Sequence, residues 1–180
     1  ARATCRNVPA KGFGKVWADY PTLQDLLGCP GEQPSYKVVV QQSFQHGQML
    51  DLIDQYGSST YKVIYVLFED GTVQGFEDKY QAGDPEPTGV VAPPGNYVPI
   101  GGFGKVWREG TSAGIRERLG WATAPEISIS QGAVLGFGRG VMVSTSPSLK
   151  KIYVLSRRSV GNTPDFSFSH WVMFDDTYEP

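Results

Sequence analysis

The chain has 180 residues, of which 40% are hydrophobic and 12% aromatic, and its formal net charge is −2. This composition predicts a globular protein with a real core rather than a disordered chain. Sixteen basic residues against eighteen acidic ones leave no general positive field, so nucleic acid is not an expected partner. Because no apolar run approaches the roughly 18 residues that a membrane span needs, no membrane span is expected either.

The N-terminal part of the chain carries both cysteines, Cys5 and Cys29. Such a pair is compatible with one disulfide, which would close a loop of about 25 residues and stabilise the fold by roughly 3 kcal/mol. The alternative is two unpaired thiols in a cytosolic protein. The spacing does not fit a zinc site, and His46 and His170 are isolated in the sequence, so we expect no metal and no cofactor.

The clearest feature of the sequence is internal repetition. The hexapeptide Gly-Phe-Gly-Lys-Val-Trp occurs unchanged at 12–17 and at 102–107. Four later landmarks follow each copy in the same order: Leu-Gly, Phe-x-x-Gly-x-Met, Ile-Tyr-Val-Leu and a Phe-acidic-Asp-x-Tyr segment. Five landmarks in one order predict two related copies, at about 12–80 and 102–178.

These copies predict a domain organisation of two tandem modules. The first is 1–80 with an N-terminal arm, the linker is 81–101, and the second module is 102–180. Prolines and glycines crowd the linker, and both residue types disfavour helices and the interior of sheets. The second module carries an insertion at about 157–168 where the first has only a short Asp-Gly turn, which fits a lengthened hairpin loop.

Each copy begins with a helical signal and continues with strands. A short helix after Pro21 is predicted to end at Gly28, and its counterpart at 115–119 ends at Gly120. The Asp70-Gly71 pair predicts a hairpin turn. The β-rich runs of the first copy are 36–44, 48–53, 61–68 and 73–76. The predicted fold class is therefore β-rich α+β, with one or two short helices packed on antiparallel strands and hairpins in each copy.

The aromatic residues admit two interpretations. Large aromatic side chains in a small module are usually buried, so each copy is expected to build a core from its own aromatics. The alternative is that some tryptophans stack against sugar rings. The candidates for either role are Trp17, Trp107, Trp121 and Trp171. The expected core aromatics are Phe13, Trp17, Phe44, Tyr65 and Phe76 in the first copy, and Phe103, Trp107, Trp121, Phe137, Tyr153 and Phe174 in the second.

Taken together, these motifs resemble a known repeat family. The hexapeptide, the run Ile-Arg-Glu-Arg-Leu-Gly-Trp-Ala at 115–122, Phe-x-x-Gly-x-Met and Ile-Tyr-Val-Leu resemble LGFP-type repeats. They look closer still to repeat modules of exported proteins from filamentous Chloroflexota-like bacteria. In LGFP-type repeats a short helix leads to Leu-Gly and then to a strand pair. Because those repeats occur on secreted envelope proteins and are thought to hold them to the cell wall, the resemblance implies attachment to the cell envelope.

No combination of residues predicts catalysis. Adjacent carboxylates such as Glu77 and Asp78 point to opposite faces of a strand, so they cannot act together as acid and base on a glycosidic bond. A Ser-His-Asp arrangement would need His46 or His170, and neither comes with a Gly-x-Ser-x-Gly elbow. We therefore expect a protein that is not an enzyme.

Two functions of different class follow. The first is a secreted structural protein of the cell envelope that assembles with copies of itself into a surface layer or filament, its N-terminal arm and 167–174 completing a neighbour's sheet. The alternative is a repeat module that binds cell-wall polysaccharide. Both place the chain outside the cell or on its surface, and the start at Ala1 without an initiator methionine fits a mature chain whose leader has been removed.

Overall fold

A computed structural model describes residues 4–54, 62–86, 88–109, 114–157 and 168–179. The chain folds into two compact units. Unit 1 comprises Ala1–Val39 and Ile129–Pro180, and unit 2 comprises Val40–Ser128. The fold is β-rich α+β, as predicted, with short helices and antiparallel strands in each unit.

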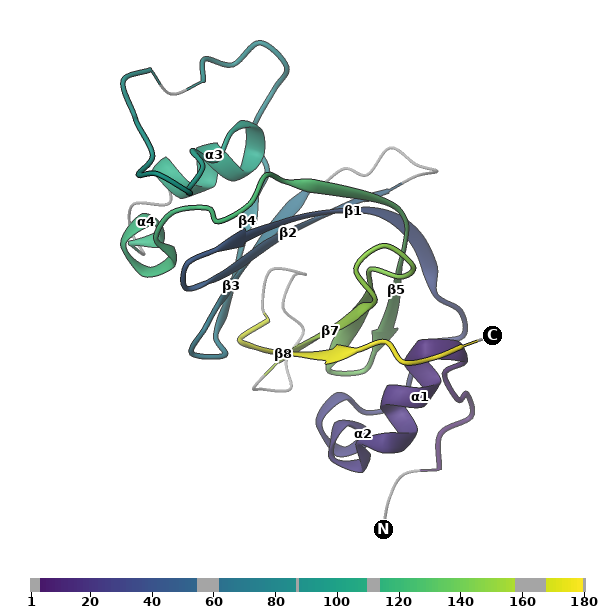
Figure 1. The fold of residues 1–180 in the computed structure, drawn as a ribbon. Coiled ribbons are helices and arrows are strands. Elements are labelled where there is room, and N and C mark those ends of the chain that lie inside the picture. Colours follow the sequence, from purple (N-terminus) through teal and green to yellow (C-terminus); the bar gives the residue numbers. More distant parts are fainter. Residues whose placement is uncertain (1–3, 55–61, 87, 110–113, 158–167, 180) are drawn as a thin grey trace. The chain divides into compact units, whose positions relative to one another are not determined.

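The elements follow the chain in the order shown in Figure 1. Unit 1 contains α1 (Lys11–Asp19), α2 (Pro21–Leu27), β6 (Gly140–Ser144), β7 (Lys151–Ser156) and β8 (His170–Asp175). Unit 2 contains β2 (Gly47–Asp54), β3 (Val63–Phe68), β4 (Val73–Glu77), α3 (Gly101–Glu109) and α4 (Ile115–Leu119). Two long strands, β1 (Ser35–Phe44) and β5 (Ile127–Phe137), each contribute one part to unit 1 and the other part to unit 2.

Unit 1 has the strand order β1-β5-β6-β7-β8. Its pairs from β5 onward are antiparallel, and the register places Leu135 opposite Met142 and Met142 opposite Val154. Helices α1 and α2 pack on this sheet through their apolar residues. The resulting core consists of Phe13, Val16, Trp17, Leu23, Leu27, Leu135, Met142, Ile152 and Val154.

Unit 2 has the strand order β4-β3-β2-β1. Its register places Met49 opposite Val66 and Ile64 opposite Phe76. All six residues of β3 are buried, which explains its continuous apolar sequence. Helices α3 and α4 supply the other side of the core, which consists of Phe44, Met49, Ile64, Val66, Phe68, Phe103, Val106, Trp107, Ile115, Leu119 and Ala122.

The two units are not the two sequence copies, 12–80 and 102–178. Helices α1 and α2 come from the first copy and pack with β5 to β8, which belong to the second. Conversely, α3 and α4 come from the second copy and pack with β1 to β4 of the first. The helix pair of each predicted copy thus packs on strands of the other predicted copy, an arrangement that we call the exchange of helix pairs. We expected the aromatic residues of each copy to pack with one another, and this expectation is wrong. Trp17 packs on Phe137 of the other copy, and Phe44 belongs to a different core cluster.

The repeated hexapeptide lies in helices α1 and α3, for which the sequence pattern gave no prediction, and it carries two glycines, which are poor helix formers. Packing explains why the glycines are there. A Cβ atom on Gly14 would collide with the carbonyl oxygen of Pro9, and one on Gly104 would collide with that of Pro99. The close approach of the backbone outweighs the helix propensity that alanine would bring.

Local signals at turns and helix ends are confirmed. Helices α2 and α4 end at Gly28 and Gly120, whose φ angles of 74° and 73° lie in the left-handed region that glycine tolerates. Between β3 and β4, Gly71 has φ 83°, and Asp70 Oδ1 accepts a hydrogen bond from the Thr72 amide at 2.9 Å. These local rules act over a few residues, and so they can be read without knowing the fold.

The segment 81–101, predicted to be a linker, is bound within unit 2. Lys105 Nζ lies 3.1 Å from Asp84 Oδ2, the Gly101 amide donates to Glu86 Oε1, and the Tyr97 amide donates to the Ala122 carbonyl. Its prolines and glycines exclude regular structure, as predicted, yet the chain packs along the unit. Of the predicted insertion at 157–168, residues 158–167 lie outside the described part of the chain.

Cys5 and Cys29 form a disulfide, which confirms the predicted pairing. Their Cα atoms are 5.3 Å apart, so the bond fastens the segment before α1 to the second residue after the end of α2. Among the described residues, every helix is too short and too polar to cross a membrane.

Candidate functional site

The candidate site is a cleft in unit 1 that encloses about 830 Å³. A space of this size is within the range of small-ligand sites. Its walls come from the segment that enters α1, the loop 31–36, strands β5 and β6, and the segment after β8. The lining residues are Val8, Pro9, Ala10, Lys11, Gly12, Phe13, Gly31, Glu32, Gln33, Pro34, Tyr36, Gln131, Ala133, Leu135, Ser144, Ser146, Pro147, Lys150, Asp176, Tyr178 and Glu179.

Strand β5 supplies one wall through alternate residues. Gln131, Ala133 and Leu135 are two positions apart and therefore share one face of the strand. Leu135 is buried in the core of unit 1, Ala133 is half-buried, and the Gln131 amide is exposed. The wall thus changes along the strand from apolar at Leu135 to hydrogen-bonding at Gln131.

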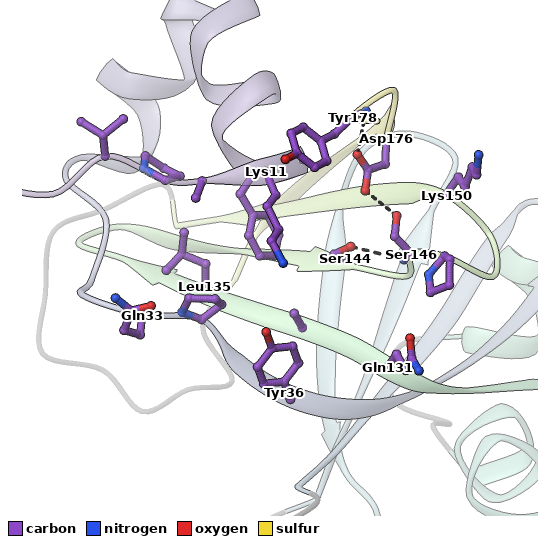
Figure 2. A pocket seen from close by; sticks show the side chains of 18 of the residues that line it. Lys11, Gln33, Tyr36, Gln131, Leu135, Ser144, Ser146, Lys150, Asp176 and Tyr178 are labelled. Atoms are coloured by element: carbon purple, nitrogen blue, oxygen red, sulfur yellow. Dashed lines mark hydrogen bonds between the residues drawn. The ribbon is translucent and has the colours of Figure 1, made fainter. Parts of the chain in front are cut away.

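Two exposed tyrosines border the cleft. Tyr36 at the start of β1 is 56% exposed and Tyr178 after β8 is 41% exposed. In Figure 2, Tyr178 and Lys11 lie on one side of the cleft, and Tyr36 and Gln131 on the other. Each tyrosine therefore presents an aromatic face and a hydroxyl group to solvent beside the cleft.

Hydrogen bonds fix the segment after β8 at the edge of the cleft (Figure 2). Ser146 Oγ donates to Asp176 Oδ2, and the Tyr178 amide donates to Asp176 Oδ1 at 3.2 Å. The Asp176 amide in turn donates to the Lys150 carbonyl at 2.8 Å. The Asp176 carboxylate also occupies the space where a side chain at Gly12 would lie. This carboxylate is therefore used in holding the cleft together.

Lys11 and Lys150 line the cleft with an unusual backbone. Their φ angles are 54° and 48°, and in the described part of the chain they are the non-glycine residues with positive φ. Left-handed backbone is unfavourable for lysine because its Cβ crowds the carbonyl oxygen. Both side chains are exposed. The cleft thus combines apolar walls, amides, hydroxyls, tyrosine rings and the ammonium group of Lys11.

Two of the four candidate tryptophans are buried. Trp17 is 6% exposed and its ring centroid lies 5.1 Å from that of Phe137 in the core of unit 1. Trp107 is 1% exposed, and its Nε1 donates to the Gly120 carbonyl at 2.8 Å in unit 2. Neither ring is accessible to a sugar.

The other two tryptophans are half-buried and lie away from the cleft lining. Trp121 in unit 2 contacts Trp107 at 5.1 Å between centroids, and the Arg116 guanidinium lies 5.3 Å from the Trp121 ring. Trp171 on β8 lies 6.3 Å from Tyr153. The structure therefore brings tyrosines, not tryptophans, to the cleft. A difference next to the two hexapeptides, Lys11 before the first and Gly101 before the second, is a signal in the sequence for the cleft that the sequence-based prediction missed.

Unit 2 contains a buried carboxyl group, Asp51 on β2. The pKa of Asp51 is raised to about 7, first by burial and second by the negative charge of Asp78, while Lys62 acts in the opposite direction. Asp51 Oδ1 has no hydrogen-bond partner among the described residues. Glu126, whose pKa is also raised by burial, lies within its electrostatic reach. Within the described chain, His, Cys, Asp and Glu form no cluster that could hold a metal ion.

Comparisons with protein-family models, with curated proteins and with solved structures give no match. The chemistry of the cleft is therefore the basis for a function.

Proposed function

We propose that the chain is an extracellular, non-catalytic binding protein whose unit 1 cleft holds a polysaccharide. The observation that carries the proposal is the lining of the cleft, in which exposed tyrosines, Tyr36 and Tyr178, stand beside the amides of Gln33 and Gln131. The resemblance to LGFP-type envelope repeats supports the same class of ligand and stays a prediction.

Sugars need this combination of groups. One face of a pyranose ring is apolar and stacks on an aromatic ring, while its hydroxyls both donate and accept hydrogen bonds. An amide such as that of Gln131 offers both kinds of partner, and so do the hydroxyls of Ser144 and Ser146.

The disulfide supports a location outside the cytoplasm. Disulfides such as Cys5–Cys29 persist in oxidising compartments and are rare in the reducing cytosol. The ligand would therefore be met at the cell surface or beyond it, where polysaccharides are abundant.

Binding accounts for more of the structure than self-assembly does. The assembly hypothesis requires the N-terminal arm and the last strand to join a neighbour's sheet. In unit 1 the arm is fastened by Cys5 to Cys29, and β8 pairs along its length with β7, from Lys151 opposite Asp175 to Ser156 opposite His170. Both segments thus serve the chain's own fold.

Affinity electrophoresis tests the proposal. The native chain is run in gels that contain one soluble polysaccharide each, from a panel of neutral glucans, xylan and acidic polysaccharides. We expect at least one to retard the chain and Tyr36→Ala to weaken that retardation by about tenfold in the apparent dissociation constant, as loss of a stacking ring does.

Tyr97→Ala is the matched control, because Tyr97 is 45% exposed and lies in unit 2. This variant is expected to migrate like the native chain. Retardation by none of the polysaccharides, or an equal loss in Tyr36→Ala and Tyr97→Ala, would contradict the proposal.

A further inference from the structure

Two lysines that line the cleft, Lys11 and Lys150, have backbone conformations that lysine rarely adopts. Lys11 has φ 54° and Lys150 has φ 48°, values that glycine adopts freely and lysine does not. Both residues line the same cleft although they are far apart in the sequence. Unfavourable backbone conformations often cluster at functional sites, so the side chains of these two lysines are candidates for a role in the cleft.

The second copy of the repeat shows that a lysine is not needed for the fold at this position. Val8-Pro9 precedes the first hexapeptide at the same distance as Val98-Pro99 precedes the second, so that Lys11 corresponds to Gly101. Gly101 has φ 56°, nearly the angle of Lys11. The same backbone is thus built with glycine in unit 2 and with lysine in unit 1, where the cleft is.

Contacts within the fold do not explain the lysine. Lys11 is exposed, and its ammonium makes no ion pair with any residue that the structure describes. The nearby Asp176 carboxylate is already bound by Ser146 and by the Tyr178 amide. Figure 2 shows the Lys11 side chain extending from the start of α1 toward the strands that form the cleft. Its positive charge is therefore available to a ligand.

We propose that the cleft takes an acidic polysaccharide, with the Lys11 ammonium paired to the carboxylate of a uronic acid. This inference rests on the proposed function, since it specifies the ligand of the same cleft. The ring of the uronic acid lies against Tyr36, and its hydroxyls bind the amides and serine hydroxyls of the lining.

The charges of the lining favour a singly charged carboxylate over a doubly charged phosphate group. The lining contains three carboxylates, of Glu32, Asp176 and Glu179, and two lysines, so its formal charge is −1, which disfavours a ligand of high negative charge density. Among the described lining residues there is no arginine, the side chain whose planar fork best matches phosphate. A singly charged carboxylate within a chain of hydroxyl groups fits this lining.

The test compares two forms of one polymer. Polygalacturonate carries a free carboxylate on each sugar, and fully methyl-esterified polygalacturonate has the same sugars without the charge. We expect the native chain to bind the free acid about tenfold more tightly than the ester, as for a hydrogen bond to a charged group, and added salt to reduce the difference.

Lys11→Gly separates binding from folding. Glycine is the residue that unit 2 uses with the same φ, so this variant is expected to melt at the same temperature as the native chain or higher, and yet to bind polygalacturonate no more tightly than the ester. Lys11→Arg is expected to retain the preference. Lys15→Gln is the control for net charge, because Lys15 lies on the same helix and pairs with Asp19 outside the cleft.

The outcomes distinguish the inference from the function on which it rests. Equal binding of acid and ester, with both weakened by Tyr36→Ala, overturns the acidic ligand and leaves a neutral polysaccharide in the cleft. A loss in Lys15→Gln equal to that in Lys11→Gly also overturns it, as does tighter binding of dextran sulfate through Lys11. No binding of any polysaccharide overturns both proposals.

Discussion

A side chain on Gly14 would collide with the carbonyl oxygen of Pro9, so the backbone before α1 and the first turn of that helix touch directly. Gly104 and Pro99 repeat the relationship at the start of α3. In each hexapeptide, the proline before the helix leaves no room for a side chain at this position. Gly14 and Gly104 are therefore required by packing.

From this contact we predict that Gly14→Ala destabilises the protein by about 1 to 3 kcal/mol, although alanine favours an isolated helix by about 1 kcal/mol. Chemical denaturation followed by circular dichroism gives the free energy of unfolding. Gly136→Ala is the control, since a Cβ atom there meets nothing within 4 Å, and its unfolding free energy should change by less than about 0.5 kcal/mol. A Gly14→Ala variant as stable as the native chain would show that the contact is not tight.

The exchange of helix pairs predicts which aromatic residues are energetically coupled. Trp17 and Phe137 lie 5.1 Å apart between ring centroids, so a double-mutant cycle with Trp17→Leu and Phe137→Leu should give a coupling of about 1 kcal/mol. Trp17 and Phe44 belong to one sequence copy but to different core clusters. Their cycle should be additive to within about 0.5 kcal/mol. Coupling of Trp17 to Phe44, with none to Phe137, would show instead that each copy packs its helices on its own strands.

Reduction of the Cys5–Cys29 disulfide should lower the free energy of unfolding by about 3 kcal/mol, because the closed loop restricts the unfolded chain. For a chain of this size the melting temperature should fall by roughly 6 to 12 °C. The double variant Cys5→Ser/Cys29→Ser should melt like the reduced native chain and should not respond to reductant. If reductant still lowered the melting temperature of the double variant, the loss of stability would have a cause other than this disulfide.

Asp51 gives unit 2 a pH dependence with a defined sign. Its pKa rises from 3.8 to about 7 on folding, so the folded chain binds the proton more tightly than the unfolded chain does. This contribution is fully present below about pH 4, is lost as the pH rises toward 7, and stays absent above that. The free energy of unfolding should therefore fall over this range.

Asp51→Asn should flatten that slope and raise the free energy of unfolding at pH 8 by about 2 kcal/mol, since the amide has no charge to bury. The control is Asp25→Asn, on the exposed surface of α2, which should change the free energy of unfolding at pH 8 by less than about 0.5 kcal/mol. Denaturation curves at pH 4, 6 and 8 measure the effect. A native slope of the opposite sign would mean that Asp51 is paired in the folded chain.

Local rules in the sequence predicted the parts of the fold that depend on neighbours along the chain. The helix ends at Gly28 and Gly120, the turn at Asp70-Gly71 and the disulfide follow from residue types and short spacings. Helix α1 did not follow, because the contact with Pro9 that makes Gly14 necessary is visible only in three dimensions.

Neither the exchange of helix pairs nor the cleft could be predicted from the sequence. Because both copies carry nearly the same apolar pattern, the helix of either copy fits the strands of either, and a list of residues cannot tell which pairing is formed. Tyr36 and Tyr178 are 142 positions apart in the chain and are brought to one cleft by the order of the strands. Trp17, the stronger candidate by residue type, is buried instead.

Hydrogen–deuterium exchange, with and without the polysaccharide that retards the chain most, tests most directly whether the unit 1 cleft is the binding site. We predict slower exchange of amides at 31–36, in β5 at 131–135 and at 144–150, with no change in β2, β3 or α3 of unit 2. Protection in unit 2 with none in these three segments would contradict the account.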